Sequence, residues 1–379
     1  MKLLSGILLV FILFFSFQNE KNRITRINTS TISGEIYKIV PQTIDFNDTI
    51  PNDTLLIYFD INKYPVKYSR KIVVGVCIDD ECRLVNIELF WNITGRYLGF
   101  ELPEGEFLSK TEHSPFQPDD YDLLHKLLSD PLSALAHYSI DELVPATDSS
   151  KIDIDAVSSA TISAVLDYIV EGAVYTTYTL WHIVYGPTKR EIENLTIEKL
   201  NSELIIKILD SNNLNDKIWV LNHISTSVEI TPELQNKFME MIAGNDIYLA
   251  ERSLNALKPE FLTDDIQIDL INIFNDTGFL LKRLIIQKLK TALRLNIEVT
   301  TTLSSQLKEM NGTLVKSTLE LFKLHKINSE KVLVQIAELL KNDNRYIAKQ
   351  AFDYLNGVDN LNKKISKKVK KYYKKMNRT

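Results

Sequence analysis

Apolar positions in the second half of the chain recur at helical spacing, in one short segment after another. Within each segment, apolar side chains lie three and four residues apart, which is typical of a helix with one buried face. Breaks rich in Asn, Asp, Ser and Gly separate the segments, as short turns between helices require. The pattern predicts helices at 197–209, 217–224, 232–242, 249–257, 266–274, 280–293, 314–324, 331–340 and 346–355.

Taken in pairs, these helices form units of roughly 30 to 40 residues, which is the period of an α-solenoid. The units resemble HEAT-type repeats without a sharp consensus. We therefore predict an all-α solenoid of HEAT-like helix pairs over residues 188–360. A plain helical bundle is the alternative.

The first half of the chain has another pattern, in which apolar and polar residues alternate over short stretches. Residues 71–78 and 83–89 are β-rich runs joined by an acidic turn, and together they predict a hairpin. Alternation over 54–61 predicts a further strand. The β-rich extension at 19–69 is either an added β-subdomain or a segment that wraps around the domain after it.

Helical patterns come after the hairpin and complete the prediction of an α+β domain at 70–187. Residues 119–128 begin with acidic side chains and continue with apolar positions at helical spacing. A second helix is expected from Ser158 to about Val170 and onward to Ile183. Its many β-branched and aromatic residues leave the second half of that helix ambiguous.

The first residues predict export. Lys2 precedes an apolar run at 3–17, which has the length of a secretory signal rather than of a spanning helix. Ser16 is the one small residue near the end of the run, so the cleavage site is poor and an uncleaved N-terminal anchor is the alternative. No cysteine lies there, which excludes a bacterial lipoprotein signal. We assign residues 1–18 to a signal peptide or anchor and predict a periplasmic or other extracytoplasmic location.

Composition and charge narrow the classes of function. Hydrophobic residues make up 45% of the 379 residues and charged residues 25%, which is typical of a globular chain. The formal net charge of -5 argues against a nucleic-acid partner. Lysines gather at 361–379, which predicts a cationic cap or a solvated tail; contact with an anionic membrane surface is the sharper alternative.

The two cysteines, Cys77 and Cys82, flank the turn of the predicted hairpin. Outside the cytosol they could form a disulfide across the two strands; the alternatives are two buried thiols or a redox-active pair. The six histidines are scattered. The chain also has no zinc-ligand spacing, no phosphate-binding glycine loop and no Gly-x-Ser-x-Gly elbow. No catalytic or metal-binding residue is therefore predicted.

One segment carries chemistry, the run Asp-Ala-Val-Ser-Ser-Ala-Thr-Ile-Ser at 155–163. It stands at the predicted start of a helix, where unpaired N–H groups and the helix dipole stabilise a phosphate. Small side chains at Ser159 and Ala160 let a phosphate approach the backbone, and neighbouring hydroxyl groups add donors. Asp155 and Ser158 would equally serve as ordinary N-cap residues, which is the alternative interpretation.

With the upstream hairpin and the downstream apolar stretch, this segment resembles the FMN-binding domain family of extracytoplasmic flavoproteins over about residues 70 to 186. The family pattern is Asp, two variable residues, Ser or Thr, Gly, Ala, Thr, a variable residue, and Thr or Ser. A flavin transferase joins the last hydroxyl to FMN through a phosphoester. The resemblance implies an FMN cofactor with Ser163 as its acceptor, surrounded by Asp155, Ser158, Ser159, Ala160 and Thr161.

Two positions depart from the family pattern. Ser159 replaces the glycine and adds a side chain where the phosphate ester would pack, at a cost of about 1 kcal/mol if a positive φ is needed there. Ser163 replaces the usual terminal threonine and keeps the hydroxyl group. Attachment therefore remains chemically feasible, while recognition by a transferase is in doubt.

Six residues between the hairpin and the segment are candidates for lining a flavin pocket: Trp91, Tyr97, Lys110, His113, Asp119 and Asp120. The ring of Trp91 could stack on an isoalloxazine, and Lys110 could neutralise a phosphate or a flavin semiquinone anion. Packing and surface roles are the alternatives. A dense aromatic and hydroxyl cluster lies after the segment, with core packing as its alternative: Tyr175, Thr176, Thr177, Tyr178, Trp181 and His182.

Two functions are consistent with these features. The resemblance implies an electron-transfer flavoprotein, similar to subunits of sodium-pumping quinone reductases, that is modified by a flavin transferase and docked to an envelope protein by its helical repeats. The other is a non-catalytic envelope scaffold that binds a protein partner and carries no flavin.

Overall fold

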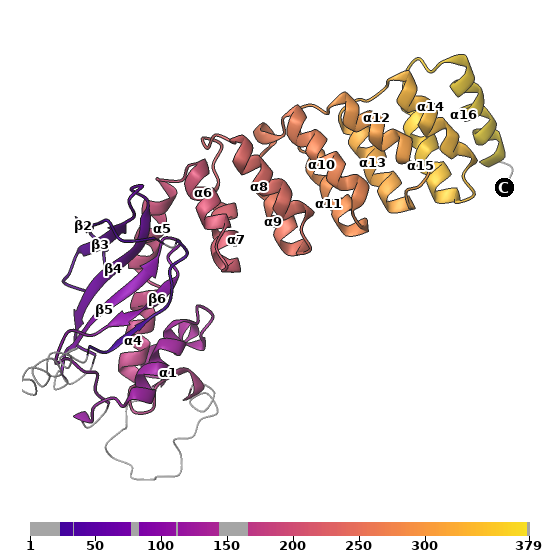
Figure 1. Ribbon diagram of the computed structural model, residues 1–379. Helices are drawn as coiled ribbons and strands as arrows, with labels where there is room; N and C mark the ends of the chain where they lie inside the picture. Colours follow the sequence, from indigo (N-terminus) through magenta and orange to yellow (C-terminus); the bar gives the residue numbers. More distant parts are fainter. Residues whose placement is uncertain (1–22, 33, 77–82, 111–112, 144–165, 377–379) are drawn as a thin grey trace, which may run out of the picture. The chain divides into compact units, whose positions relative to one another are not determined.

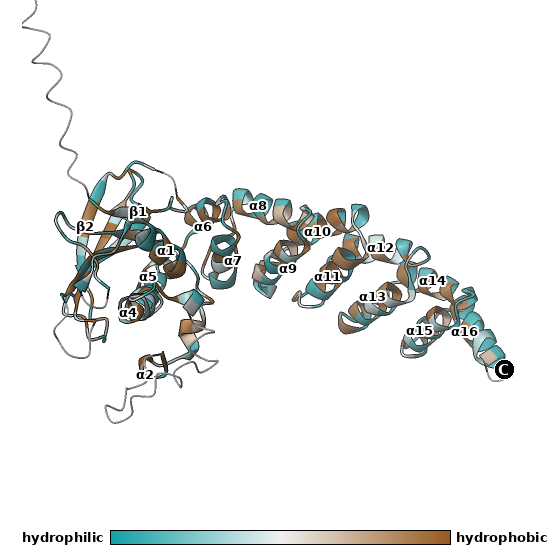
Figure 2. Ribbon diagram, turned by 90° about the horizontal axis from the view of Figure 1, so that it is seen from below, coloured by the Kyte–Doolittle hydropathy of each residue, from teal (hydrophilic) through white to brown (hydrophobic). Residues whose placement is uncertain are grey.

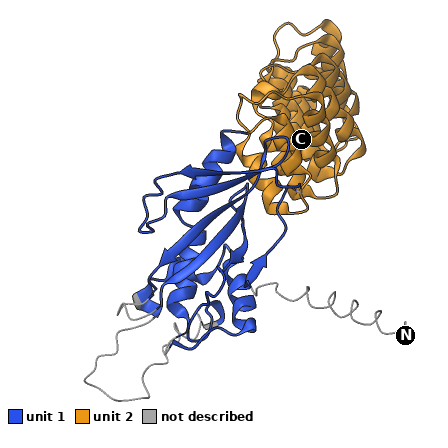
Figure 3. Ribbon diagram, turned by 60° about the vertical axis from the view of Figure 1, so that its left-hand side comes forward, with its two compact units in different colours: residues 1–199 blue, residues 200–379 orange. Residues whose placement is uncertain are grey.

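The computed structural model describes residues 23–32, 34–76, 83–110, 113–143 and 166–376 (Figure 1). The chain divides into two compact units, an N-terminal unit at Met1–Lys199 and a helical unit at Leu200–Thr379 (Figure 3). The N-terminal unit is an α+β domain and the second unit is all-helical, as the sequence predicts at this level. None of the described helices is long and apolar enough to span a membrane.

In the described part of the N-terminal unit, six strands form one antiparallel sheet in the order β1-β6-β5-β4-β3-β2. The predicted hairpin is confirmed, because β4 pairs with β5 and Ile72 lies opposite Ile87. Cys77 and Cys82 lie outside the described residues. The strands are β1 Thr25–Ile27, β2 Lys38–Thr43, β3 Thr54–Phe59, β4 Pro65–Val74, β5 Val85–Asn92 and β6 Tyr97–Glu101.

The β-rich stretch before residue 70 is part of this sheet. Its strands β2 and β3 extend one edge and β1 forms the other, next to β6. Gly99 permits the pairing of β1 with β6, because a Cβ atom there would lie 1.8 Å from the carbonyl oxygen of Arg26. The extension therefore completes the sheet that the hairpin begins.

One face of the sheet is apolar and packs against helices α1, α4 and α5. The alternation of side chains along a strand places its apolar set on this face, where burial contributes about 25 cal/mol per Å² of apolar surface. The strands supply Leu55, Ile57, Tyr68, Ile72, Ile87, Leu89, Trp91 and Phe100 to the core. The helical elements of this unit are α1 Pro118–Leu128, η2 Ala134–His137, α2 Ile140–Leu143, η3 Leu166–Tyr168, α4 Val174–Val184 and α5 Pro187–Ile197.

The helix expected to run on from Ser158 to Ile183 is interrupted. A short 3-10 turn ends at Tyr168, and α4 begins only at Val174. Between them Gly172 adopts a φ of 73°, a left-handed conformation that ends a helix. The part of the prediction before residue 166 lies outside the described residues.

Helix α5 belongs to the N-terminal compact unit, which ends at Lys199. Ile192 is fully buried, and the hydroxyl groups of Tyr68 and Thr196 lie 3.3 Å apart. The change from strand-like to helical periodicity marks where helices begin. It does not show that the first of them packs on the sheet.

The helical unit places its helices in two rows (Figure 2). Consecutive even-numbered helices pack on one another, as do consecutive odd-numbered helices, and α8 packs on α9 as α10 does on α11. The elements are α6 Ser202–Leu209, α7 Leu214–His223, α8 Pro232–Ala243, α9 Ile247–Ala256, η4 Pro259–Phe261, α10 Asp264–Asp276, α11 Phe279–Leu289, α12 Ile297–Gln306, α13 Gly312–Leu324, α14 Glu330–Glu338, η5 Leu339–Lys341, α15 Arg345–Asn356 and α16 Lys363–Met376.

The last lysine-rich stretch forms a capping helix rather than a solvated tail. Helix α16 packs on α14 and α15, and its Ile365 and Val369 are buried there. Asn362 begins the helix by accepting a hydrogen bond from the backbone N–H of Ile365 at 2.8 Å. The helix therefore closes the end of the apolar core between the two rows.

Candidate functional site

The segment predicted to carry the flavin lies outside the described residues. This applies to Asp155, Ser158, Ser159, Ala160, Thr161 and Ser163. The chain leaves the described structure after Leu143, at the end of α2, and re-enters it at Leu166, at the start of η3. Both elements precede α4, and α2 packs against it. The described candidate site nearest to the segment along the chain is therefore the surface of α4.

Helix α4 divides the predicted aromatic and hydroxyl cluster into a buried and a half-buried side. Thr176, Thr177 and Trp181 are buried, which agrees with core packing. Tyr175, Tyr178 and His182 are half-buried and recur at a spacing of three and four residues, so they share one side of the helix. The ring centroids of Tyr178 and His182 lie 4.2 Å apart.

His182 is the chemically distinctive member of this stripe. Burial lowers the pKa of His182, although a hydrogen bond with the Leu135 backbone acts in the opposite direction. The ring is therefore neutral at pH 7, and its buried Nε2 atom has no hydrogen-bond partner among the described residues. Because this nitrogen is buried, the stripe offers a planar ligand only the half-buried ring surfaces of Tyr178 and His182.

Trp91 occupies a core position. Its side chain is fully buried in β5, and the indole Nε1 donates a 3.0 Å hydrogen bond to the Val184 carbonyl oxygen. The ring thus joins the sheet to the end of α4. Trp91 is therefore placed as a packing residue, because no part of its ring is exposed for a ligand to stack on.

Lys110 forms an ion pair with Asp120 at 2.8 Å. Burial acts to raise the pKa of Asp120, but hydrogen bonds from Lys110 and the Gln117 backbone prevail and lower it. Asp120 also accepts the Gln117 backbone N–H at the start of α1. Lys110 therefore ties its loop to the first turn of α1, and a ligand phosphate would have to compete with this carboxylate.

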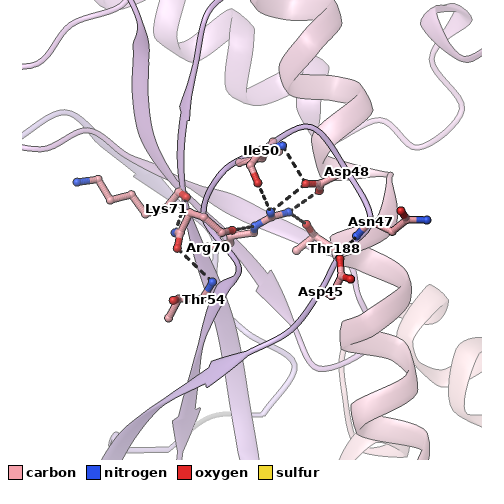
Figure 4. Close-up of polar contacts among 9 residues, drawn as sticks. Asp45, Asn47, Asp48, Ile50, Thr54, Arg70, Lys71 and Thr188 are labelled. Carbon is pink, nitrogen blue, oxygen red and sulfur yellow. Dashed lines mark hydrogen bonds and ion pairs between the residues drawn. The ribbon is translucent and has the colours of Figure 1, made fainter.

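A buried polar network surrounds Arg70 and was not predicted (Figure 4). The fully buried guanidinium donates to the Asp48 carboxylate at 2.6 and 3.1 Å and to the Asn52 carbonyl oxygen at 2.8 Å. It also donates to Thr188 Oγ1 at 2.8 Å and lies 3.8 Å from the centre of the Phe46 ring. Because this cation is fully partnered, its role is to join β4, the loop before β3 and helix α5.

A second polar cluster lies on the open face of the sheet. Ser69 Oγ donates to the Glu88 carboxylate at 2.5 Å and lies 3.1 Å from the Tyr58 hydroxyl oxygen. Lys67 Nζ lies 4.7 Å from the centre of the Tyr58 ring and 4.9 Å from that of Phe90. Burial lowers the pKa of Lys67 while Glu88 opposes that change. These cross-strand contacts satisfy one another and stabilise the exposed face.

The helical unit carries an exposed apolar row that the sequence patterns did not single out. Its odd-numbered helices begin at Leu214, Ile247, Phe279, Gly312 and Arg345, which are 32 or 33 residues apart. Apolar side chains in these first turns are between 40% and 55% exposed. We call them the apolar row: Leu214, Ile247, Tyr248, Phe279, Leu280 and Tyr346.

The first turns of α13 and α15 lie side by side in this row. A Cβ atom at Gly312 would stand 2.9 Å from the Tyr346 ring, so the glycine leaves room for that ring. A first turn ordinarily favours polar and acidic residues, because the positive end of the helix dipole and unpaired N–H groups face solvent there. Apolar residues repeated at this position are therefore an unusual feature of the described surface.

Two hollows lie on the described surface. One, of about 610 Å³, lies at the end of the hairpin and is lined by Thr49, Pro51, Asn52, Val73, Val74, Gly75 and Leu84. The other, of about 380 Å³, lies between α8 and α10 and is lined by Pro232, Gln235, Asn236, Asp265, Ile268 and Asp269. Neither hollow is lined by a nucleophile next to a base. The described residues contain no cluster of His, Cys, Asp and Glu that could hold a metal.

Comparison of the chain with family models, with curated proteins and with solved structures gave no match in any of the three.

Proposed function

We propose that this protein is a docking protein whose helical region is an α-solenoid of HEAT-like helix pairs that binds a protein partner along the apolar row. The observation that carries the proposal is the repeated exposure of apolar side chains in the first turns of α7, α9, α11 and α15. Helix starts 32 or 33 residues apart along the odd-numbered row support the solenoid. A stacked array of this kind offers an extended surface suited to protein partners.

The energetic argument rests on the cost of leaving these side chains in water. Covering a large apolar side chain stabilises a complex by roughly 1.5 to 3 kcal/mol when burial is complete. The row repeats such side chains at regular steps, so a partner that covers several of them gains their contributions together. Isolated exposed apolar residues are normal and would need no such explanation.

A photo-crosslinking experiment tests this docking proposal in the native envelope. A photoreactive amino acid replaces Tyr248 or Phe279 in the full chain, and matched probes replace Leu293 or Leu324, which are at least 61% exposed but lie outside the row. We expect one discrete crosslinked partner from the row positions and none from the control positions. Equal crosslinking from all four positions would contradict the proposal.

Substitution of the row should abolish that complex without unfolding the unit. The triple variant Tyr248→Ser, Phe279→Ser and Leu280→Ser should reduce co-purification of the crosslinked partner at least about tenfold. The control triple variant Leu293→Ser, Ile297→Ser and Leu324→Ser removes apolar side chains that are more exposed, at 61–78% against 40–55%, and should leave it unchanged. Matching far-ultraviolet circular dichroism of both variants would show that the helices are retained.

A second candidate function is electron transfer by FMN held on Ser163, and the 155–163 segment favours it. The half-buried Tyr178 and His182 on α4 add a stacking surface beside the elements that flank this segment. The two functions are compatible, because a docked carrier needs both a cofactor and a partner. The helical unit would then hold the flavin domain close to an envelope redox partner.

Intact mass spectrometry tests the flavin. The full chain is produced in its native compartment together with a flavin transferase, and we expect a mass increase equal to one FMN minus water. Ser163→Ala should erase that increase, whereas Thr161→Ala should lower its yield and keep the acceptor. Unmodified wild-type protein under these conditions would refute the flavin and leave the docking proposal standing.

We also infer that residues 1–18 direct export, either as a cleaved signal peptide or as an N-terminal anchor. The apolar run at 3–17 after Lys2 supports this inference. Fractionation of cells expressing the full chain or a chain lacking residues 1–18 separates the outcomes. Retention of both forms in the cytoplasm would contradict export, and the N-terminal sequence of the exported form would distinguish cleavage from anchoring.

A further inference from the structure

The outer face of the capping helix α16 is covered by lysines. The helix contains eight lysines and no acidic residue between Lys363 and Met376. Its apolar stripe of Ile365, Val369 and Tyr372 turns inward toward α14 and α15. The exposed lysines on the remaining surface are Lys363, Lys364, Lys367, Lys370, Lys371, Lys374 and Lys375.

Four of these lysines form a straight stripe opposite the buried face. At 100° per residue, Lys363, Lys367, Lys370 and Lys374 fall within one narrow sector of the helix. None of the four makes an ion pair with a described residue. By contrast, Lys368, on the flank of the helix, pairs with Glu338. The stripe therefore presents concentrated positive charge directly to solvent.

Neither helix formation nor ordinary solubility requires this arrangement. Lysines in the last turn complement the negative end of the helix dipole, but Lys363 and Lys364 stand in the first turn, where a positive charge is unfavourable. Like charges three and four residues apart also repel and destabilise the helix. The preceding α15 has a mixed pattern, with Lys349 paired to Asp353 at 2.6 Å. An unmixed lysine stripe thus carries a cost that an external anion would offset.

We propose that the lysine stripe of α16 binds the surface of a membrane rich in anionic phospholipids. Lysine supplies a mobile point charge suited to many phosphate groups at once. Specific recognition of nucleic acid or phosphopeptides relies instead on the planar fork of arginine, which α16 lacks. Tyr373, 51% exposed on the same helix, adds an amphipathic ring of the kind that favours the lipid interface.

Vesicle binding by the full chain tests this proposal. Wild-type protein should co-sediment with vesicles of phosphatidylcholine mixed with phosphatidylglycerol, and not with vesicles of phosphatidylcholine alone. High salt should release it, because exposed charges are screened within about 10 Å at 0.1 M ionic strength. Binding to neutral vesicles of equal strength, or binding that salt does not weaken, would overturn the proposal.

A charge-matched pair of variants locates the surface. The variant Lys363→Gln, Lys367→Gln, Lys370→Gln and Lys374→Gln should weaken vesicle binding on the order of 100-fold. The control variant Lys308→Gln, Lys323→Gln, Lys326→Gln and Lys331→Gln removes four other exposed lysines of the helical unit and should bind within about twofold of wild type. Equal losses of vesicle binding in the two variants would show that binding depends only on net charge, and would overturn the assignment to α16.

Two further measurements make the outcome decisive. Thermal unfolding should show both variants to be at least as stable as wild type, because the substituted side chains lie on the exposed face and the stripe variant loses repulsion between lysines. If the stripe variant unfolds early, the salt and lipid dependence of wild-type binding still decides the question. Binding of the wild-type chain to duplex DNA or RNA in place of vesicles would show a different anionic partner and refute the membrane assignment.

Discussion

A buried arginine network distinguishes the N-terminal unit, whereas the ion pairs of the helical unit, like the other ion pairs of the N-terminal unit, are at least partly exposed. In the N-terminal unit, Arg70 is fully buried and its partners come from segments that are distant in sequence. In the helical unit, ion pairs such as Lys290–Glu320 and Arg294–Asp264 lie nearer the surface and join residues 30 positions apart. A buried cation needs all its partners, whereas each exposed pair contributes little. Loss of the buried cation should therefore destabilise its unit far more than loss of any one exposed pair.

Removing the buried cation should have the largest effect. We expect Arg70→Ala to lower the free energy of unfolding of the N-terminal unit by about 3–5 kcal/mol, because the Asp48 carboxylate and nearby carbonyl oxygens lose their donor. Denaturant unfolding in a Trp219→Phe background measures this, since the remaining tryptophans, Trp91 and Trp181, lie in that unit.

Its matched control is Arg294→Ala, which breaks the exposed pair with Asp264 in the helical unit. Stability should then change by no more than about 1 kcal/mol. Similar losses of stability for Arg70→Ala and Arg294→Ala would contradict the difference between buried and exposed charges.

A cavity in the helical unit should have a smaller and more local effect. Leu303 is fully buried in α12, and Leu303→Ala should cost about 3 kcal/mol through lost burial and an unfilled cavity. Hydrogen exchange should accelerate in α10, α12 and α14, while amides in β4 and β5 keep their protection. Uniform acceleration through both units would indicate that they unfold as one.

The loss of a helix cap should be smaller again. The Asp246 carboxylate accepts the backbone N–H groups of Tyr248 and Leu249 at 2.9 and 3.1 Å. Asp246→Ala should destabilise the helical unit by about 1 kcal/mol in a urea titration. Asp246→Asn keeps an acceptor at the same place and should recover most of that loss; an equal loss in both variants would argue against capping.

Acidification should produce the smallest effect, at the junction of α14 and α16. Hydrogen bonds from Lys368 and Lys341 lower the pKa of Glu338 to about 2. A lowered folded-state pKa adds stability above the unfolded value near 4.5, and this is lost as the pH falls toward 2. Because both side chains of the Lys368–Glu338 pair remain in contact with solvent, the effect should not exceed about 1 kcal/mol. The pH dependence of α16 amide exchange measures it, and Glu338→Gln should flatten the curve.

Local patterns in the sequence predicted the elements that depend on local contacts. The hairpin of β4 and β5 and helices such as α8, α13 and α15 arise directly from period-two and period-3.6 alternation. Helix α12 was missed because its buried face combines Val299 and Leu303 with Thr300 and Ser304, which weakens the apolar period. The pairing of β1 with β6 joins residues far apart in the chain, and no local pattern encodes it.

Some candidate sites were likewise visible as local sequence patterns, whereas others form only when distant residues come together in the fold. The residues at 155–163 indicated a phosphate site, but not which other residues surround it. Trp91 was a candidate because the sequence does not show which side of a strand is buried. The Arg70 network was missed, since its partners Asp48 and Thr188 become neighbours only after folding. The apolar row had a readable signal: aligning the segments at their 32- or 33-residue offset brings Leu214, Ile247 and Phe279 into register.

The regular offset between helix starts also sets the length of the apolar row. If the helical unit is the solenoid proposed above, adding or deleting about 33 residues would lengthen or shorten the row by one step without changing the contacts inside the other units. The number of such units would then fix the distance between the first and last contacts with the proposed partner. A partner with its own regular spacing would bind in register at one length and lose contacts at every other.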